Sequence, residues 1–556
     1  MGARTFGDPG NQNQLGRIGM NSRQLLEEGR RDELWMKHCG YFTLSPEEFM
    51  DVQNRLLLEQ INVLEKSQIG KQLFGNKTPT SVEEFRENVP LTTYEDYAEY
   101  FDQHNEDVLP VKPFVWVRTS GRTSTKGPKW IPYTKSMHDH LGDLTVGAML
   151  MASASFTGDV KLERNDKFLL ATAPPPYVSA FVSRSAQEQL DVKFLPSLEE
   201  GENMEYAERV ALGFRLAMRE GMDYFMGLAS VLARMGEQFE QQSSSTKPSK
   251  EMLDPATLFR LIKAVITAKL HGRNILPKDI WKLKGIMTGG ADTIVYGRKI
   301  EYYWGKKPLQ GFGCTEGGNV AMQGWNGKGM VFTPDNVFLE FIPLDEHLKN
   351  KENPNYKPKT LLYNELDLGI YEFVLTNFHG GALTRYRIGD LFEVISLGDE
   401  ELGSPLPQMR FYSRADDVID MGNLIRLTES DIWKAIEATG VQYQDWAARK
   451  EFNSDKVNLH IYLEPKPSES ITVDDFKAKL ALELSKLTDE FSGLDEILGR
   501  NPLQISYLEP GSFDAYIKQK QEEGADLAHI KPPHMQPSDQ IMKSLQGFKG
   551  NIPKTP

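Results

Sequence analysis

The sequence has few cysteines, no excess of positive charge and no long apolar run. Cys39 and Cys314 are its two cysteines, so a disulfide framework and a multi-thiolate zinc site are excluded, and a cytoplasmic location is expected. Lys and Arg number 64 against 78 Asp and Glu, and the net charge of -14 opposes binding to nucleic acid or to an anionic membrane. The longest uncharged run, residues 144–158, is shorter than a membrane span, and we expect a buried helix there.

Length and composition are those of a large globular protein. At roughly 150 residues per domain, the 556 residues make about three to four domains, or fewer larger ones. Hydrophobic residues make up 40% and charged residues 26%, which is enough for a sizeable core. Residues 1–20 are polar and rich in Gly and Asn, and we expect them to form a disordered tail.

Helix start signals recur through the first hundred residues. Ser45–Glu48 combines an N-cap serine, a first-turn proline and a capping-box glutamate. Ser81–Glu84 repeats the capping box, and Thr92–Glu95 indicates a third start. The N-terminal segment is therefore expected to be helical.

Beyond Pro113, short β-rich runs alternate with long helical stretches. This alternation predicts an α/β fold with a mainly parallel sheet. The expected strands are Phe114–Val117, Lys167–Ala171, Lys284–Met287 and Leu309–Phe312. After Tyr371 the strands follow one another closely, which predicts an antiparallel or β-barrel-like subdomain. Its expected strands are Tyr371–Thr376, Leu383–Ile388, Leu391–Ile395 and Met409–Tyr412.

A separate C-terminal domain is expected beyond Glu429. The pattern there is helix, strand, helix, strand and helix over about 120 residues, which suits a small α+β domain. The sequence therefore predicts a tail at 1–20, a large domain at 21–425 and a small, mobile domain at 426–556.

The first candidate binding segment is Thr119–Lys129, a loop of hydroxyl, glycine and basic side chains that follows a β-rich run. Such a loop offers backbone N–H groups, Ser and Thr donors and positive charge to a polyphosphate. It is not a Walker A loop, because Lys126 stands where the second Gly of that motif falls. An ordinary exposed turn would have a similar composition.

A second polar segment, Thr315–Gly318, follows another expected strand. Ligands bind at the carboxyl ends of strands in an open α/β sheet, so Thr315 and Glu316 are expected to face the same crevice as the first loop. The Glu316 carboxylate suits Mg²⁺, and Phe312 could stack on a base. A solvated charge near a helix start is the alternative for Glu316, and Cys314 is expected to be a buried thiol.

Two further segments carry charged side chains near glycine turns. Asp390, the last residue of Thr376–Asp390, could accept hydrogen bonds from two ribose hydroxyls. An ion pair between Arg387 and Asp390 at the surface is the alternative. Ser413–Glu429 lies at the expected domain boundary and, taken alone, consists of charged loop residues.

The order of these four segments resembles that of the adenylate-forming superfamily of acyl-CoA synthetases, luciferases and peptide-synthetase adenylation domains. The superfamily motifs are TSGTTGxPK, YGxTE, YRTGD and GRxDDxIKxxGx[RK]. Their counterparts here are Thr119–Lys129, Phe312–Glu316, Tyr386–Asp390 and Ser413–Arg426. The resemblance implies the adenylate-forming fold, ATP and Mg²⁺ as cofactors, and activation of a carboxylic acid.

Within that superfamily the sequence resembles the auxin-responsive Gretchen Hagen family of acyl acid-amido synthetases. Phe85–Tyr97 is similar to the family's EEFRKxVPLxTYEDY, and Pro128–Thr134 to its PKFIPFT. Gly511–Pro533 is similar to its GTFD...G...QYKTPR, so the resemblance spans about residues 40–535.

Three positions depart from the family pattern. Arg122 lengthens the phosphate loop by one residue, and Phe312 stands where Tyr is usual. His534 stands near the family's Arg.

Carried over residue by residue, the resemblance implies a set of site residues. Thr315 and Lys531 would be catalytic, Glu316 would hold Mg²⁺, and Asp420 would be the hinge of the small domain. The ATP-binding residues would be Thr119, Ser120, Gly121, Thr123, Ser124, Lys129, Gly290, Ala291, Asp292, Phe312, Gly313, Cys314, Thr315, Asp390 and Arg414. The loop of Pro176, Tyr177 and Val178 is the candidate for the acid pocket, although a rigid surface turn explains it as well.

The sequence thus predicts an ATP- and Mg²⁺-dependent ligase that converts a small carboxylic acid to an acyl adenylate and passes the acyl group to an amino acid. An acid-CoA ligase is the alternative, because the wider superfamily shares the nucleotide motifs. A non-catalytic small-molecule-binding homologue is a third hypothesis, and the intact Glu316, Asp390 and Lys531 argue against it. Neither nucleic acid nor a membrane is expected as a partner.

Overall fold

The computed structural model describes residues 20–119, 129–202, 204, 206–242, 255–289, 293–415, 417–420, 426–453, 456–487, 502–523, 530 and 533–548. The chain divides into two compact units. The larger consists of Met1–Ile388 and Glu393–Arg410, and the smaller of Gly389–Phe392 and Phe411–Pro556. The tail predicted at residues 1–20 lies outside the described residues except for its last residue, and the predicted division after residue 425 stays a prediction.

Capping side chains begin the N-terminal helices of the larger unit. Helix α3 (Pro46–Leu64) follows Ser45, whose hydroxyl accepts from the N–H of Glu48 at 3.1 Å, and the Glu48 carboxylate accepts from the N–H of Ser45 at 2.8 Å. At α5 (Val82–Asn88) the Ser81 hydroxyl accepts from the N–H of Glu84 at 3.2 Å, while the Glu84 carboxylate accepts from the N–H of Thr80 at 2.9 Å, so the predicted capping box is only half formed. These two predicted helices are confirmed. The third signal begins only a 3₁₀ turn, η2 (Tyr94–Asp96), and the one-turn helix α6 (Ala98–Phe101).

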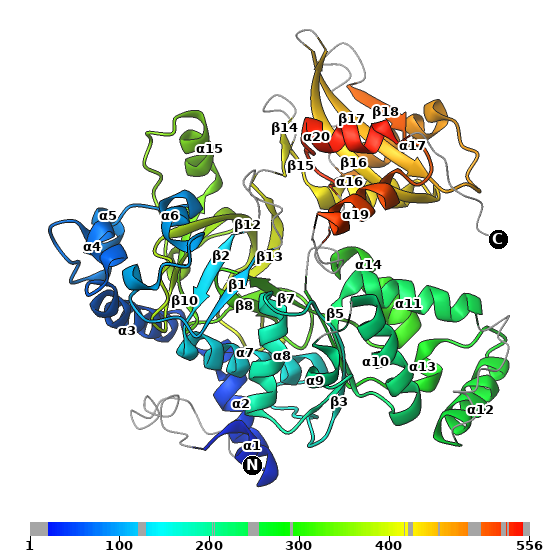
Figure 1. The fold of residues 1–556 in the computed structure, drawn as a ribbon, viewed down its shortest axis with the longest axis horizontal. Helices are drawn as coiled ribbons and strands as arrows, with labels where there is room; N and C mark the ends of the chain where they lie inside the picture. The colour runs from blue at the N-terminus through cyan, green and yellow to red at the C-terminus, as the bar shows by residue number, and fades with distance from the viewer. Residues whose placement is uncertain are drawn as a thin grey trace. The chain divides into compact units, whose positions relative to one another are not determined.

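An eleven-stranded mixed sheet is the largest element of the fold (Figure 1). The strands in chain order are β3 (Lys167–Ala171), β4 (Lys193–Leu195), β5 (Tyr224–Leu228), β6 (Gly285–Gly289), β7 (Leu309–Cys314), β8 (Gly318–Gln323), β9 (Met330–Phe332), β10 (Val337–Pro343), β11 (Gly369–Asn377), β12 (Tyr386–Ser396) and β13 (Gln408–Arg414). Their order in the sheet is β10-β11-β12-β13-β9-β8-β7-β6-β5-β3-β4. The strands from β4 to β7 are parallel, and β7 pairs antiparallel with β8. The α/β fold class is therefore confirmed.

Two predicted groups of strands join differently from the expectation. The strand at 114–117 is β1 (Val115–Arg118), which pairs antiparallel with β2 (Trp130–Tyr133) in a separate two-stranded sheet. The predicted phosphate loop therefore connects a hairpin and does not follow a strand of the main sheet. The strands expected at 371–412 extend the main sheet, and two of them are parts of the single strand β12.

Helices pack against the parallel strands. The helix predicted from the uncharged run is α7 (Lys135–Ser153), which packs on β6, β7 and β8 and against α8 (Val178–Gln189). Helix α10 (Tyr206–Glu220) packs on β3 and β4, and α11 (Ala229–Gln242) packs on β5 and α14 (Thr293–Trp304). Among the described helices, none is long and apolar enough to cross a membrane. The other helices among the described residues of this unit are α1 (Ser22–Glu27), α2 (Arg31–Cys39), η1 (Gly40–Thr43), α4 (Gln68–Phe74), η3 (Glu106–Val108), α9 (Leu198–Gly201), α12 (Pro255–Leu270), α13 (Pro277–Ile280), α15 (Leu344–Glu352) and η5 (Tyr363–Glu365).

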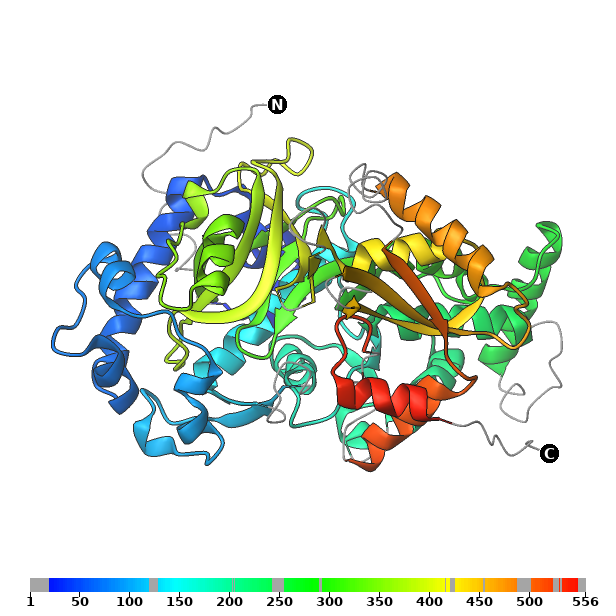
Figure 2. The same ribbon diagram turned by 90° about the horizontal axis from the view of Figure 1, so that it is seen from above.

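The smaller unit is a three-layer α+β structure (Figure 2). Its sheet has the order β16 (Tyr443–Asn453), β17 (Lys456–Pro465) and β18 (Leu503–Tyr507), and it lies between two pairs of helices. Trp446 and Ala448 pack with α16 (Glu429–Ala438) and α17 (Val473–Leu487), whereas Ala447 packs with α19 (Ser512–Glu522) and α20 (Asp539–Gly547). Side chains alternate between the two faces of a strand, so one strand serves both cores. A short hairpin of β14 (Ile419–Asp420) and β15 (Arg426–Leu427) precedes the sheet.

Candidate active site

Lys129, which precedes β2, is held by aromatic rings and a hydroxyl. Its Nζ lies 5.2 Å from the ring centroid of Tyr94 and donates to the Oη of Tyr386 at 3.2 Å. Among the described residues, no acidic side chain forms an ion pair with Lys129. Ring faces attract an ammonium group without cancelling its charge, so the charge of Lys129 stays available to an anionic ligand.

Backbone pairing with the segment before η2 positions Tyr386. The N–H of Thr92 donates to the carbonyl of Arg385 at 2.9 Å, and the N–H of Arg387 donates to the carbonyl of Thr92 at 2.8 Å. These bonds hold the first residue of β12 beside the N-terminal segment. Burial, followed by the charge of Glu316, raises the pKa of Tyr386 well above its usual range. Tyr386 is therefore a neutral phenol.

Tyr94 is fixed by two hydrogen bonds. Its Oη donates to Asp102 Oδ1 at 2.7 Å and accepts from the N–H of Trp130 at 3.0 Å. Burial and the Asp102 hydrogen bond raise the pKa of Tyr94 above its usual range. Tyr94 and Tyr386 were not predicted as site residues, although both stand in the motifs that carry the family resemblance.

Glu316 lies in the turn between β7 and β8, where Cys314 pairs with Gly318. Gly318 has a φ of +69°, which glycine adopts without strain. The turn is held by Asn377 Nδ2, which donates to the carbonyl of Glu316 at 2.8 Å, and by Tyr133 Oη, which donates to the carbonyl of Thr315 at 2.9 Å. The alternative of a charge near a helix start is therefore wrong.

The carboxylate of Glu316 is buried close to the aromatic residues. Glu316 is 7% exposed, and no described Lys, Arg or His forms an ion pair with it. Its charge contributes to the raised pKa values of Tyr94, Tyr133 and Tyr386. A buried carboxylate needs a cation or hydrogen-bond donors, and its hard oxygen ligands suit Mg²⁺. Lys129, Tyr94, Tyr386 and Glu316 are called the Lys129 site below.

Thr119 closes the base of the predicted phosphate loop. Its Oγ1 accepts from the N–H of Lys129 at 2.9 Å, and its own N–H donates to the carbonyl of Lys129 at 2.9 Å. Four predicted members of the loop lie outside the described residues. They are Ser120, Gly121, Thr123 and Ser124.

The predicted acid loop lies next to this base. The N–H of Arg118 donates to the carbonyl of Pro176 at 3.0 Å, and Arg118 and Tyr177 form an isolated parallel bridge. Val178 begins α8. The structure thus brings the predicted acid loop and Thr119 together.

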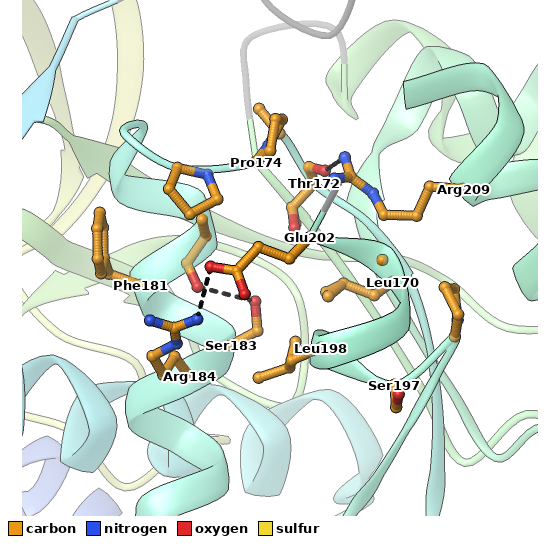
Figure 3. A pocket seen from close by; sticks show the side chains of 15 residues that line it. Leu170, Thr172, Pro174, Phe181, Ser183, Arg184, Ser197, Leu198, Glu202 and Arg209 are labelled. Atoms are coloured by element: carbon orange, nitrogen blue, oxygen red, sulfur yellow. Dashed lines mark hydrogen bonds and ion pairs between the residues drawn. The ribbon is translucent and has the colours of Figure 1, made fainter. Parts of the chain in front are cut away.

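A small cavity of about 40 Å³ lies beside the chain that leads into this loop (Figure 3). Thr172, Pro174 and Phe181 line it, and Arg184 Nη2 pairs with Glu202 Oε1 at 3.1 Å at its edge. This volume holds a few water molecules and is too small for a carboxylic acid of drug size. The acid pocket assigned to Pro176, Tyr177 and Val178 therefore stays a prediction.

The other predicted nucleotide residues of the larger unit are placed in part. Gly290, Ala291 and Asp292 lie outside the described residues, between the end of β6 and the start of α14. Phe312 and Gly313 lie on β7 before the Glu316 turn. Cys314 is a buried free thiol, as expected.

In the smaller unit, Asp390 on β12 pairs with Arg414 on β13. Arg414 Nη1 donates to Asp390 Oδ1 at 2.8 Å, and the carboxylate is buried. Arg387 instead pairs with Glu372 at 2.7 Å, so the expected alternative of an Arg387–Asp390 pair is wrong. Asp420 pairs through its backbone with Arg426 in the short hairpin.

In the smaller unit, the buried His534 lies between two carboxylates. Its Nδ1 lies 2.6 Å from Glu429 Oε1 and its Nε2 lies 2.7 Å from Asp445 Oδ1, while its ring stacks on Trp446 at 4.4 Å. Burial lowers the pKa of His534, but the charges and hydrogen bonds of Asp445 and Glu429 outweigh it and raise the pKa to about 9. These four residues are called the His534 cluster below.

The His534 cluster also fixes the chain that follows Lys531. The N–H of Ala448 donates to the carbonyl of His534 at 2.6 Å, and the N–H of Gln536 donates to the carbonyl of Ala448 at 2.8 Å. Residues 534–536 are therefore tied to the edge of β16. Lys531 itself lies outside the described residues.

Several known proteins are similar to this chain in sequence and in fold. The sequence matches the GH3 family N-terminal domain over residues 41–174 and the GH3 family central domain over residues 330–414. It is 21% identical over 527 residues to the indole-3-acetic acid-amido synthetase GH3.15 of Arabidopsis thaliana, covering 83% of this chain and 86% of that protein. It is 26% identical over 235 residues to the 4-substituted benzoates-glutamate ligase GH3.12 of the same plant, covering 39% of this chain and 38% of that protein.

Two solved structures extend the comparison to the fold. The AtGH3.15 acyl acid amido synthetase in complex with 2,4-DB has a TM-score of 0.63 at 17% identity and covers 98% of this chain and 97% of its own. A 2-hydroxyisobutyryl-CoA ligase in the postadenylation state has a TM-score of 0.59 at 13% identity and covers 91% of this chain and 94% of its own.

The fold is that of these two structures, an acyl acid amido synthetase and a CoA ligase. The sequence is similar to the GH3 family in the two matched domains, and to GH3.15 along most of its length.

Proposed function

We propose that this chain is an ATP-dependent ligase that activates a carboxylic acid as an acyl adenylate and transfers the acyl group to the amine of an amino acid. The observation that carries the proposal is the Lys129 site. Four segments of the chain meet there: η2 with Tyr94, the end of the first loop with Lys129, the β7–β8 turn with Glu316 and the start of β12 with Tyr386. An ammonium and a carboxylate that form no ion pair with any described residue suit, in one place, a phosphate with its metal ion.

ATP is expected to lie along the predicted motifs. Thr119, Lys129 and the loop between them would bind its phosphates. Asp390 would accept the ribose hydroxyls, with Arg414 orienting its carboxylate. Glu316 would hold Mg²⁺, which when bound supplies neutralisation of the phosphate charge. The adenine would lie against Gly290, Ala291, Asp292, Phe312 and Gly313.

The first half-reaction joins the acid to AMP. A carboxylate oxygen of the acid attacks the α-phosphorus, a new P–O bond forms, and the bond to pyrophosphate breaks. Negative charge grows on the nonbridging oxygens in this step. Lys531, supplied by the smaller unit, would stabilise that charge, and Thr315 would lie beside the α-phosphate.

The second half-reaction releases AMP. The amine attacks the acyl carbon, loses a proton to solvent or to a base, and the C–O bond to AMP breaks to leave an amide. Movement of the small domain about Asp420 would take the chain from the arrangement that forms the adenylate to the arrangement that transfers the acyl group. Lys531 is then needed only for adenylate formation.

Amine rather than thiol is the favoured acceptor. The matched relatives along this chain are named as an amido synthetase and a glutamate ligase. Acid-CoA ligase is the second candidate, since a 2-hydroxyisobutyryl-CoA ligase has the same fold.

Pyrophosphate release with a panel of carboxylic acids tests the proposal. The panel should include indole and benzoate acids, and each acid should be assayed alone, with amino acids and with CoA. We expect acid-dependent release and an amide product. A thioester formed only with CoA would establish the second candidate, and no release with any acid would favour a non-catalytic homologue.

A further inference from the structure

His138 on α7 is buried, and neither of its ring nitrogens has a hydrogen-bond partner among the described residues. Its side chain is 0% exposed. The ring packs edge-on against Phe114 at 5.1 Å and Phe181 at 6.4 Å. Most buried imidazoles have a hydrogen-bond partner, so this arrangement is costly unless a ligand binds a ring nitrogen.

Two carboxylates lie next to the unpartnered nitrogen. His138 Nδ1 is 3.5 Å from Asp139 Oδ1 and 3.9 Å from Glu188 Oε2, and the three ligand atoms lie within 4.8 Å of one another. Bonds of about 2 Å to a tetrahedral ion separate its ligand atoms by roughly 3.3 Å. Both carboxylate side chains are 47% exposed, so the small shifts that would close this geometry are open to them.

Lys135 already pairs with both carboxylates, but it leaves the two ring nitrogens of His138 without a hydrogen bond. Its Nζ pairs with Asp139 and lies 3.3 Å from Glu188 Oε2. The Lys135 side chain is 53% exposed and lines an open groove of about 600 Å³ together with Phe114. The ammonium can therefore move into solvent, and an ion can reach the two half-exposed carboxylates from solvent.

We propose that His138, Asp139 and Glu188 bind a divalent transition-metal ion of the Zn²⁺ type, with Lys135 as the competing cation. One imidazole nitrogen and two carboxylates suit such an ion, with solvent as the fourth ligand. A hard ion such as Mg²⁺ prefers oxygen ligands alone. The site is separate from Glu316 and does not depend on the proposed ligase activity. A bound ion would join the first turn of α7 to the end of α8.

Titrating the full chain with Zn²⁺ in a calorimeter, in the presence of excess Mg²⁺, tests the site. Glu188→Gln and His138→Phe should each weaken this binding by roughly tenfold or more. Lys135→Met should strengthen it, because it removes the competing ammonium. His271→Gln, which changes an exposed histidine just after α12, is the matched control and should leave the binding unchanged. Glu188 is half exposed, so Glu188→Gln keeps the test open if His138→Phe does not fold.

Cobalt provides a second readout. Co²⁺ at this site should give visible absorption bands of a tetrahedral ion, and these should be lost in Glu188→Gln. Zn²⁺ affinity that is the same in wild type, Glu188→Gln and His138→Phe would overturn the proposal, as would a Lys135→Met chain that binds no Zn²⁺.

Discussion

The two units hold a buried or partly buried cation in opposite ways. In the larger unit Lys129 lies against two tyrosine rings and one hydroxyl, and no described carboxylate pairs with it. In the smaller unit His534 lies between two carboxylates at 2.6 and 2.7 Å. A cation matched by full opposite charge holds chain segments together, whereas a cation supported by ring faces is left to be neutralised by a ligand. We therefore infer that the charge of His534 stabilises the fold and that the charge of Lys129 binds a ligand.

The largest expected effect comes from the lysine three residues before the His534 cluster. Lys531→Ala should reduce pyrophosphate release about a thousandfold, because it removes a cation that acts on the transition state of adenylate formation. Transfer from a supplied, preformed acyl adenylate to the amine should persist. Circular dichroism should show an intact fold. Equal loss of both half-reactions would mean that the lysine serves both steps, and the division of roles would fail.

The structural role of His534 predicts a pH-dependent stability. Its pKa is raised from 6.5 to about 9 in the folded chain, so its contribution is complete below pH 6.5 and is lost as the pH rises through 9. The shift corresponds to about 3 kcal/mol of the free energy of unfolding. Urea unfolding of the smaller unit, measured at pH values across this window, should show the decline. In His534→Gln the pH dependence should be flatter over the same window; an unchanged slope would contradict the charged state of His534.

The binding role of Glu316 predicts a loss of activity with little loss of stability. Glu316→Gln keeps the size of the side chain but removes the charge that would hold Mg²⁺, so pyrophosphate release should fall about a hundredfold and recover in part at high Mg²⁺. Glu401→Gln, at a half-exposed carboxylate that pairs with Lys328, is the control and should behave as wild type. Wild-type release by Glu316→Gln at low Mg²⁺ would remove Glu316 from the site.

The smallest expected effect concerns the Tyr386 hydroxyl, which accepts a hydrogen bond from Lys129. Tyr386→Phe keeps the ring and removes the 3.2 Å hydrogen bond, so the KM for ATP should rise about fivefold, equivalent to about 1 kcal/mol, with little change in kcat. Tyr363→Phe is the matched buried control, since the Tyr363 hydroxyl donates to the carbonyl of Pro407. That variant should lose stability without a change in KM. Identical KM values for the two variants would show that the Tyr386 hydroxyl does not orient Lys129.

Local chemistry made much of the fold predictable. Capping at Ser45 and Ser81 gave correct helix starts, and the apolar run Lys167–Ala171 is β3 without adjustment. The strand β16 was missed, because charged residues flank its short apolar run of Trp446, Ala447 and Ala448, which are buried on both faces of the sheet. The partner of β1 was also wrong, since a short apolar run does not specify which strand it pairs with.

The candidate site was predictable where one motif holds the residue and unpredictable where contacts join distant segments. Glu316 and Lys129 stand in motifs, so they were found. Tyr94 becomes a neighbour of Lys129 through the hydrogen bond from the N–H of Trp130, and Tyr386 through the pairing of Thr92 with the start of β12. The partners of His534 are likewise distant in the sequence, and nothing in the sequence around His534 indicates them.

The central claim is that an acyl adenylate lies between the acid and its amide, and an oxygen label tests it most directly. An acid that is active in the panel would be prepared with oxygen-18 in both carboxylate positions and incubated with the chain, ATP and an amino acid. The account predicts one labelled oxygen in the AMP and the other in the amide carbonyl, with unlabelled pyrophosphate. ADP together with labelled inorganic phosphate, or labelled AMP with a thioester as the only acyl product when CoA is supplied, would contradict it.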